Sequence, residues 1–105
     1  MRLLKFKVNG QRIIKDPECD FGNIVAGTEG YLYAEFSFSK EWNGCKNIAR
    51  FIRGGKEHAF ILDGTNTCKI PSEVLTGRTF KVGILGCKEG YRITTNDLTI
   101  HQEVS

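Results

Sequence analysis

Apolar and polar residues alternate in several short runs along this chain, and such alternation predicts strands rather than helices. The clearest run is residues 31–39, "YLYAEFSFS", where Leu32, Ala34, Phe36 and Phe38 fall on one face. Polar residues and tyrosines occupy the other face, which is typical of an antiparallel strand with one buried side. Similar runs occur at 3–15, 46–70, 79–87 and 91–102. No segment between them is long enough to form a crossover helix, which excludes a parallel βαβ fold.

Turn signals separate these runs. The sequence contains 12 glycines and two prolines, and Asn9-Gly10, Gly54-Gly55 and the stretch 63–66, "DGTN", predict turns. The stretch 71–75, "PSEVL", is the one helical candidate and is a single turn at most. The pattern therefore predicts an all-β protein of seven to nine short strands with at most one helical turn. We expect a single domain over residues 1–105, folded as an antiparallel β-sandwich of immunoglobulin-like or jelly-roll-like type.

The period-two pattern also predicts which side chains form the core. Trp42, the one tryptophan, follows the strand at 31–39 at the break "KEWNGC", and we expect it to be a buried corner residue rather than a ligand contact. The other residues expected to be buried are Leu4, Phe6, Val8, Leu32, Ala34, Phe36, Phe38, Phe51, Phe60, Leu62, Phe80, Val82, Ile84, Leu98 and Ile100.

Composition limits the classes of function. The formal charge of +3 is mild, so we do not expect nucleic-acid binding. No apolar run approaches the roughly 20 residues of a membrane span, and no membrane association is expected. The four cysteines form no CxxC pair, so we expect free thiols in a reducing compartment and no zinc site.

The sequence contains no motif that carries enzymatic chemistry, because GxSxG, HExxH, a Walker loop and GxGxxG are all absent. We therefore expect a non-enzymatic protein with no catalytic residue, metal or cofactor. Tyr31 and Tyr33 share the polar face of their strand with Glu35, and two neighbouring rings there favour a protein-binding surface. A covering layer or stacking against a sugar are the alternative interpretations of the two tyrosines.

A second candidate is a basic patch formed by Arg50, Arg53 and Lys56 around one turn. Arginines beside an aromatic residue could bind nucleic-acid phosphates and bases. We favour the interpretation that these charges keep an edge hairpin soluble.

The motif "EFSFSKEWNGCKNIARF" resembles a small β domain of tail and baseplate proteins from phages of Gram-positive bacteria. It is similar to the N-terminal, virion-anchoring domain of baseplate upper proteins and related fibres. "NIVAGTEG" before this motif and "ILDGTNTCKIPSEVL", "FKVGILG" and "RITTNDLTI" after it extend the resemblance over about residues 21–100. In that family a long helical or fibrous region after the domain carries host binding, so the resemblance implies attachment to a virion and not host recognition.

The resemblance implies a non-enzymatic phage or prophage structural protein of a tail, baseplate or fibre attachment. Such a protein would be a virion component made in the bacterial cytoplasm, and its partner would be a virion or host protein. Self-association around a symmetry axis through the Tyr31 and Tyr33 face is also expected. The alternatives are a free-standing phage inhibitor of a host protein and a carbohydrate-binding module.

Overall fold

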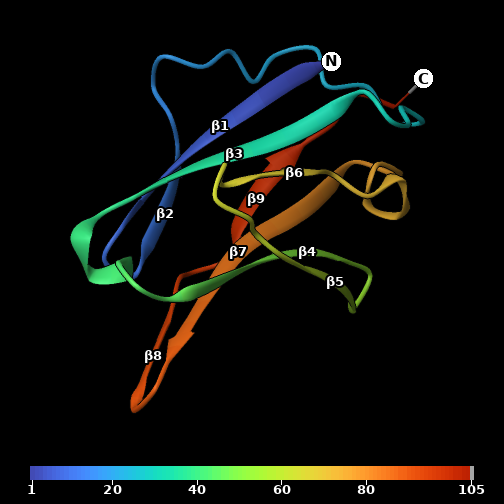
Figure 1. Cartoon of the computed structure of the whole chain (residues 1–105). Coiled ribbons are helices and arrows are strands. Elements are labelled where there is room, and N and C mark those ends of the chain that lie inside the picture. Colours follow the sequence, from blue (N-terminus) through green and yellow to red (C-terminus); the bar gives the residue numbers. More distant parts are fainter. Residues whose placement is uncertain (105) are drawn as a thin grey trace.

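The computed structural model describes residues 1–104 and contains two β-sheets packed face to face (Figure 1). The first sheet consists of β1 (Arg2–Asn9), β2 (Arg12–Lys15), β3 (Leu32–Phe38) and β6 (Thr67–Lys69), in the order β2-β1-β3-β6. The second consists of β4 (Lys46–Arg53), β5 (Lys56–Ile61), β7 (Thr79–Lys88), β8 (Tyr91–Thr94) and β9 (Leu98–His101). Its order is β5-β4-β7-β8, and β9 also pairs with β7. The prediction of an all-β sandwich is thus confirmed.

Two details differ from the expected pattern. β1 and β3 pair in parallel, although every other strand pair is antiparallel. The segment 16–31 between β2 and β3 brings the chain back to the start of the sheet without a helix, and its length satisfies the dozen or so residues that a parallel connection needs. Two single 3-10 turns are present instead of one, at Lys40–Trp42 (η1) and at the expected position, Ser72–Val74 (η2).

The core lies between the sheets and follows the alternation of the sequence. Of the residues expected to be buried, Phe38 and Leu98 are only half-buried, and Phe60 has an exposed fraction of 39%. The prediction for Phe60 was wrong because β5 is an edge strand with no neighbour beyond it. The core also contains residues that were not predicted: Ile13, Ile24, Ala49, Ile70, Val74, Leu75 and Ile93. All of them except Ala49, which lies on β4, come from four-residue strands, turns or connecting segments.

Trp42 closes one end of the sandwich, as expected. It ends η1, the turn that joins β3 of the first sheet to β4 of the second. Its side chain is 2% exposed, and its ring lies 5.4 Å from that of Phe38. The indole Nε1 donates a hydrogen bond of 2.9 Å to the carbonyl of Gly10, so the polar atom of the ring is paired where it is buried.

The four cysteines have free thiols and are half-buried. Burial raises the pKa of the Cys68 thiol to about 12, and the nearby charge of Asp63 acts in the same direction. No helix within residues 1–104 has the length and hydrophobicity needed to cross a bilayer.

Candidate functional site

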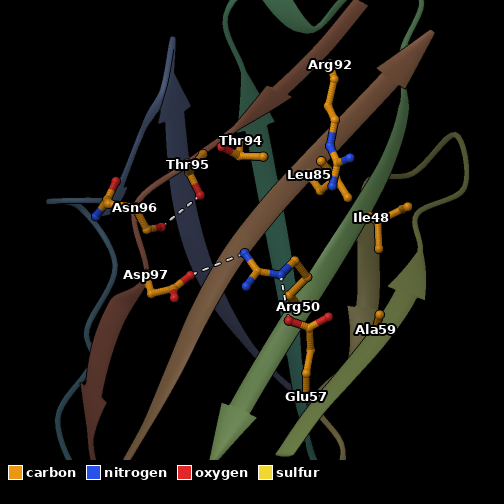
Figure 2. A pocket seen from close by; sticks show the side chains of 10 residues that line it. All are labelled: Ile48, Arg50, Glu57, Ala59, Leu85, Arg92, Thr94, Thr95, Asn96 and Asp97. Carbon is orange, nitrogen blue, oxygen red and sulfur yellow. Dashed lines mark hydrogen bonds and ion pairs between the residues drawn. The ribbon is translucent and has the colours of Figure 1, made fainter. Parts of the chain in front are cut away.

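A hollow lies on the outer face of the second sheet, on the side opposite the core. It has a volume of about 630 Å³ and crosses four strands, from β5 over β4 and β7 to β8 (Figure 2). Its floor is formed by Ile48, Ala59 and Leu85, whose side chains point away from the core because they alternate with buried residues. The linker between β8 and β9 forms one wall.

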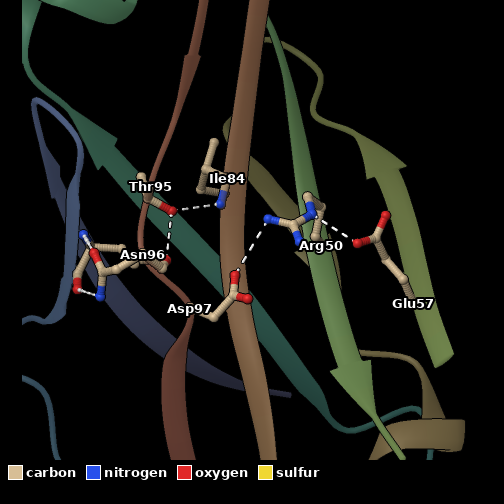
Figure 3. Close-up of polar contacts among 7 residues, drawn as sticks. Arg50, Glu57, Ile84, Thr95, Asn96 and Asp97 are labelled. Carbon is tan, nitrogen blue, oxygen red and sulfur yellow. Dashed lines mark hydrogen bonds and ion pairs between the residues drawn. The ribbon is translucent and has the colours of Figure 1, made fainter. Parts of the chain in front are cut away.

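An ion-pair network extends from this wall across the sheet to β5. The Arg50 Nε atom lies 2.9 Å from Glu57 Oε1, and its Nη1 atom lies 3.3 Å from Asp97 Oδ1 (Figures 2 and 3). Gly83 on β7 makes this arrangement possible, because a Cβ at that position would lie 2.5 Å from Asp97 Oδ1 and 3.0 Å from Arg50 Nη1. Arg50 therefore crosses β7 close to its backbone and pairs with two carboxylates.

The polar residues of the linker serve the fold. The Thr95 hydroxyl accepts a hydrogen bond from the Ile84 amide and donates one to the Asn96 carbonyl (Figure 3). The Asn96 side chain accepts a 2.9 Å hydrogen bond from the Ile13 amide and donates a 3.5 Å bond to the Ile13 carbonyl. Asn96 thus behaves like one residue of a paired strand and joins the second sheet to the edge of the first.

Apolar side chains continue across the same outer face. Ile61 pairs directly with Ile48, and Ile48 pairs directly with Leu85. We call these three residues the aliphatic row. Ile61 is 64% exposed, while Ile48 and Leu85 are half-buried. Side chains at directly opposed positions contact one another, so the row forms a continuous apolar strip from the edge strand to the centre of the sheet.

The lining of the hollow combines apolar side chains with charged ones. Its lining includes no histidine or cysteine, and Thr95 already uses its hydroxyl within the fold. Within residues 1–104, no group of three or more His, Cys, Asp or Glu side chains is placed to hold a metal ion. Arg92 points over the floor toward Leu85 (Figure 2), and the two ion pairs of the described residues do not include it. The hollow therefore offers an apolar floor and one further guanidinium.

The residues predicted to bind protein lie on the opposite side of the molecule. Tyr33 and Glu35 are half-buried on the outer face of the first sheet. Tyr33 lies between Leu3 and Lys69 on the neighbouring strands, and Tyr31 directly precedes β3 and is 50% exposed. The structure therefore places the three residues on one side, with a lysine beside Tyr33.

The predicted basic patch is dispersed. Arg50 lies on the outer face and is paired with Glu57 and Asp97. Arg53 instead donates hydrogen bonds to Thr76 Oγ1 and to the Thr79 carbonyl. Lys56 is exposed at the β4–β5 turn. Arg53 follows Arg50 by three positions, and in a strand this spacing directs the two side chains to opposite faces.

Comparison of the chain with protein-family models, with curated proteins and with solved structures found no match.

Proposed function

We propose that this chain is a non-enzymatic phage or prophage structural protein that attaches to other virion proteins through the outer face of its second sheet. The observation that carries the proposal is the aliphatic row beside the Arg50 network. The outer face of a sheet is usually polar where it contacts only water. Here the outer face instead has a continuous apolar strip, formed by Ile61, Ile48 and Leu85.

The physical setting of the row resembles that of protein interfaces. Apolar residues at the centre with charged residues at the rim are the usual arrangement. Here the charged side chains of Arg50, Glu57 and Asp97 lie beside the row and are joined by two ion pairs. The resemblance of residues 21–100 to virion-anchoring domains supports a virion protein as that partner.

The outer face of the first sheet is the second candidate surface. Tyr31 is half exposed, and Tyr33 lies between Leu3 and Lys69. We propose that this face contributes a separate contact, either with a further virion protein or in self-association. The hollow itself has no aromatic side chain in its lining, so stacking against a sugar would have to use these tyrosines.

The test is binding to purified virion proteins and, separately, to a lysate of uninfected host cells. We expect the wild-type chain to retain a virion component and the Ile48→Glu variant to lose it, because a charge would replace the centre of the aliphatic row. Asn43→Glu places the same charge at an exposed position in the turn between η1 and β4, outside both sheet faces, and serves as the control. The Tyr31→Ser, Tyr33→Ser double variant tests the second face in the same assay.

Each alternative predicts a different outcome. Retention of a host protein and of no virion protein would favour the inhibitor hypothesis. Loss of virion binding only in the tyrosine variant would move the attachment surface to the first sheet. If the wild-type chain retains no virion component, the proposed function is wrong.

A further inference from the structure

We infer that two copies of this chain associate by pairing their β5 strands antiparallel about a two-fold axis through Ala59. The inference goes beyond attachment to a virion, since it concerns a sheet edge and a second copy of the same chain. It rests on the backbone of β5, on the arrangement of its charges and on the state of the other sheet edges.

β5 is the longest open edge among the described strands. It has six residues, pairs only with β4, and is exposed at every position except His58. In the first sheet, edge strands β2 and β6 have four and three residues. On β2, the amide and the carbonyl of Ile13 are already hydrogen-bonded to the Asn96 side chain. On the other side of the second sheet, the linker between β8 and β9 interrupts the edge. An exposed edge strand that is long and uninterrupted favours pairing with another chain.

The register of β4 and β5 shows which backbone groups are available. The Leu62 amide donates to the Asn47 carbonyl, and hydrogen-bonded pairs alternate with non-bonded pairs along an antiparallel ladder. Phe60 and His58, opposite Ala49 and Phe51, therefore direct their backbone groups toward β4. The N–H and C=O groups of Glu57, Ala59 and Ile61 point away from the sheet.

These three outward-facing residues are symmetric about Ala59. A two-fold axis there places Ala59 of one copy opposite Ala59 of the other. It also places Glu57 of each copy opposite Ile61 of the other. The three pairs would form about six backbone hydrogen bonds. The axis passes beside the smallest side chain of the strand, where the two backbones meet with the least steric hindrance.

Charge and hydrophobic contact favour the same register. Lys56 and Glu57 occupy one end of β5, and apolar Phe60 and Ile61 occupy the other. Pairing centred on Lys56 or Glu57 would place identical charges directly opposite, which is destabilising. Pairing about Ala59 separates the like charges and places His58 of each copy opposite Phe60 of the other, which covers a ring that is 39% exposed.

The result would be a closed dimer with one sheet continuous across both copies. Each copy uses its β5 edge once, and an isologous contact of this kind leaves no complementary edge for a third copy. A partner strand added to a sheet edge is a common mode of protein recognition, and here the added strand is the same sequence.

A charge-pair experiment tests the inference. In separate preparations, Ala59→Lys and Ala59→Glu would each place two like charges at the axis, so each variant should be monomeric by analytical ultracentrifugation. An equimolar mixture of the two variants should form a heterodimer, because the introduced ammonium of one chain would then lie opposite the introduced carboxylate of the other. Thr94→Lys places a positive charge at the opposite edge of the second sheet, where Thr94 is exposed, and it should dimerise like the wild type.

Amide hydrogen exchange gives an independent measurement on the wild-type chain. With increasing protein concentration, the amides of Glu57, Ala59 and Ile61 should become protected, whereas those of His58 and Phe60 should not change. A wild-type chain that remains monomeric up to about 1 mM, the weak end of the affinity scale, would overturn the inference. A dimer that both Ala59 variants form as readily as the wild type would also overturn it. Neither result depends on binding to a virion, so the two proposals fail separately.

Discussion

The ring of Trp42 lies directly against the backbone of Gly86: a Cβ built at Gly86 would be 2.8 Å from both Cε3 and Cζ3 of the indole. Trp42 belongs to the turn between the sheets, and Gly86 lies on the core-facing side of β7. Real Cβ atoms do not approach ring carbons this closely, so the position of the indole depends on the absence of a side chain at residue 86.

We predict that Gly86→Ala destabilises the protein by about 1–3 kcal/mol, the range for overpacking a filled core. The indole has little freedom to move, because its Nε1 atom is bonded to the Gly10 carbonyl. Chemical denaturation with tryptophan fluorescence measures both the stability and the environment of Trp42. Gly64→Ala is the control, since no atom lies within 4 Å of a Cβ there, and a similar loss in both variants would contradict the prediction.

The same substitution at Gly83 should have a smaller effect. A Cβ there would meet the ends of the Asp97 and Arg50 side chains, which are free to move toward solvent. We predict that Gly83→Ala lowers the free energy of unfolding by less than about 1 kcal/mol, the usual value of an exposed ion pair. Arg50→Met should change the free energy of unfolding by a similar amount. If Gly83→Ala destabilises the protein as much as Gly86→Ala does, Gly83 is not there to make room for the Arg50–Asp97 ion pair.

Phe36→Ala should destabilise the protein by about 3–5 kcal/mol, as aromatic truncations in cores do. Phe36 is 2% exposed, and its ring stacks on that of Phe6 at a centroid distance of 5.3 Å. Phe60→Ala is the matched control, because the 39% exposed ring of Phe60 belongs to the edge strand. Denaturant midpoints at a low protein concentration compare the two variants without any contribution from self-association, and equal losses would contradict the assigned burial.

We predict that Asn96→Ala costs about 1–3 kcal/mol, because the Ile13 amide would lose its acceptor. The Ile13 amide should also exchange with solvent faster than in the wild type. Asn96→Asp keeps an acceptor for this amide but loses the donor to the Ile13 carbonyl, so its effect on Ile13 exchange should be smaller. Unchanged exchange at Ile13 in the alanine variant would show that Asn96 does not join the sheets.

The Cys68 thiol provides a prediction about alkaline pH. Its pKa in the folded protein is raised from 9.0 to about 12 by burial, so between these values the unfolded chain releases a proton that the folded chain keeps. Stability should therefore be unaffected by this group below pH 9 and should decrease as pH rises above it. Unfolding free energies of wild type and Cys68→Ala, measured from about pH 8 to about pH 11, should show the smaller decrease in the variant. Parallel pH profiles would contradict the raised pKa.

The period-two pattern predicted which faces of β3 and β7 are buried. One face of each strand packs against the other sheet, and successive side chains of a strand point to opposite faces. The pattern failed at Phe60, since alternation does not show whether a strand lies at the edge of a sheet. The same pattern could have separated Arg50 from Arg53, whose odd spacing places them on opposite faces.

The hollow could not be predicted from local sequence. It forms because Asp97, in the linker after β8, approaches Arg50 across Gly83, and the chain separates these residues by 47 positions. The aliphatic row likewise depends on the registers of two strand pairs. One local signal existed: Ile48, Ile52 and Leu85 fall on the faces opposite the predicted core positions, where polar residues would be usual.

The position of β7 has a consequence for how the chain folds during synthesis. This strand pairs with β4, β8 and β9, so the second sheet has no centre until residue 88 has left the ribosome. All strands of the first sheet, together with the β4–β5 hairpin, emerge before it. The core of a nascent chain therefore lacks Phe80, Val82 and Ile84, and contacts between residues far apart in sequence slow folding. A chaperone that holds extended apolar segments would act on this protein during that interval, before β7 completes the sandwich.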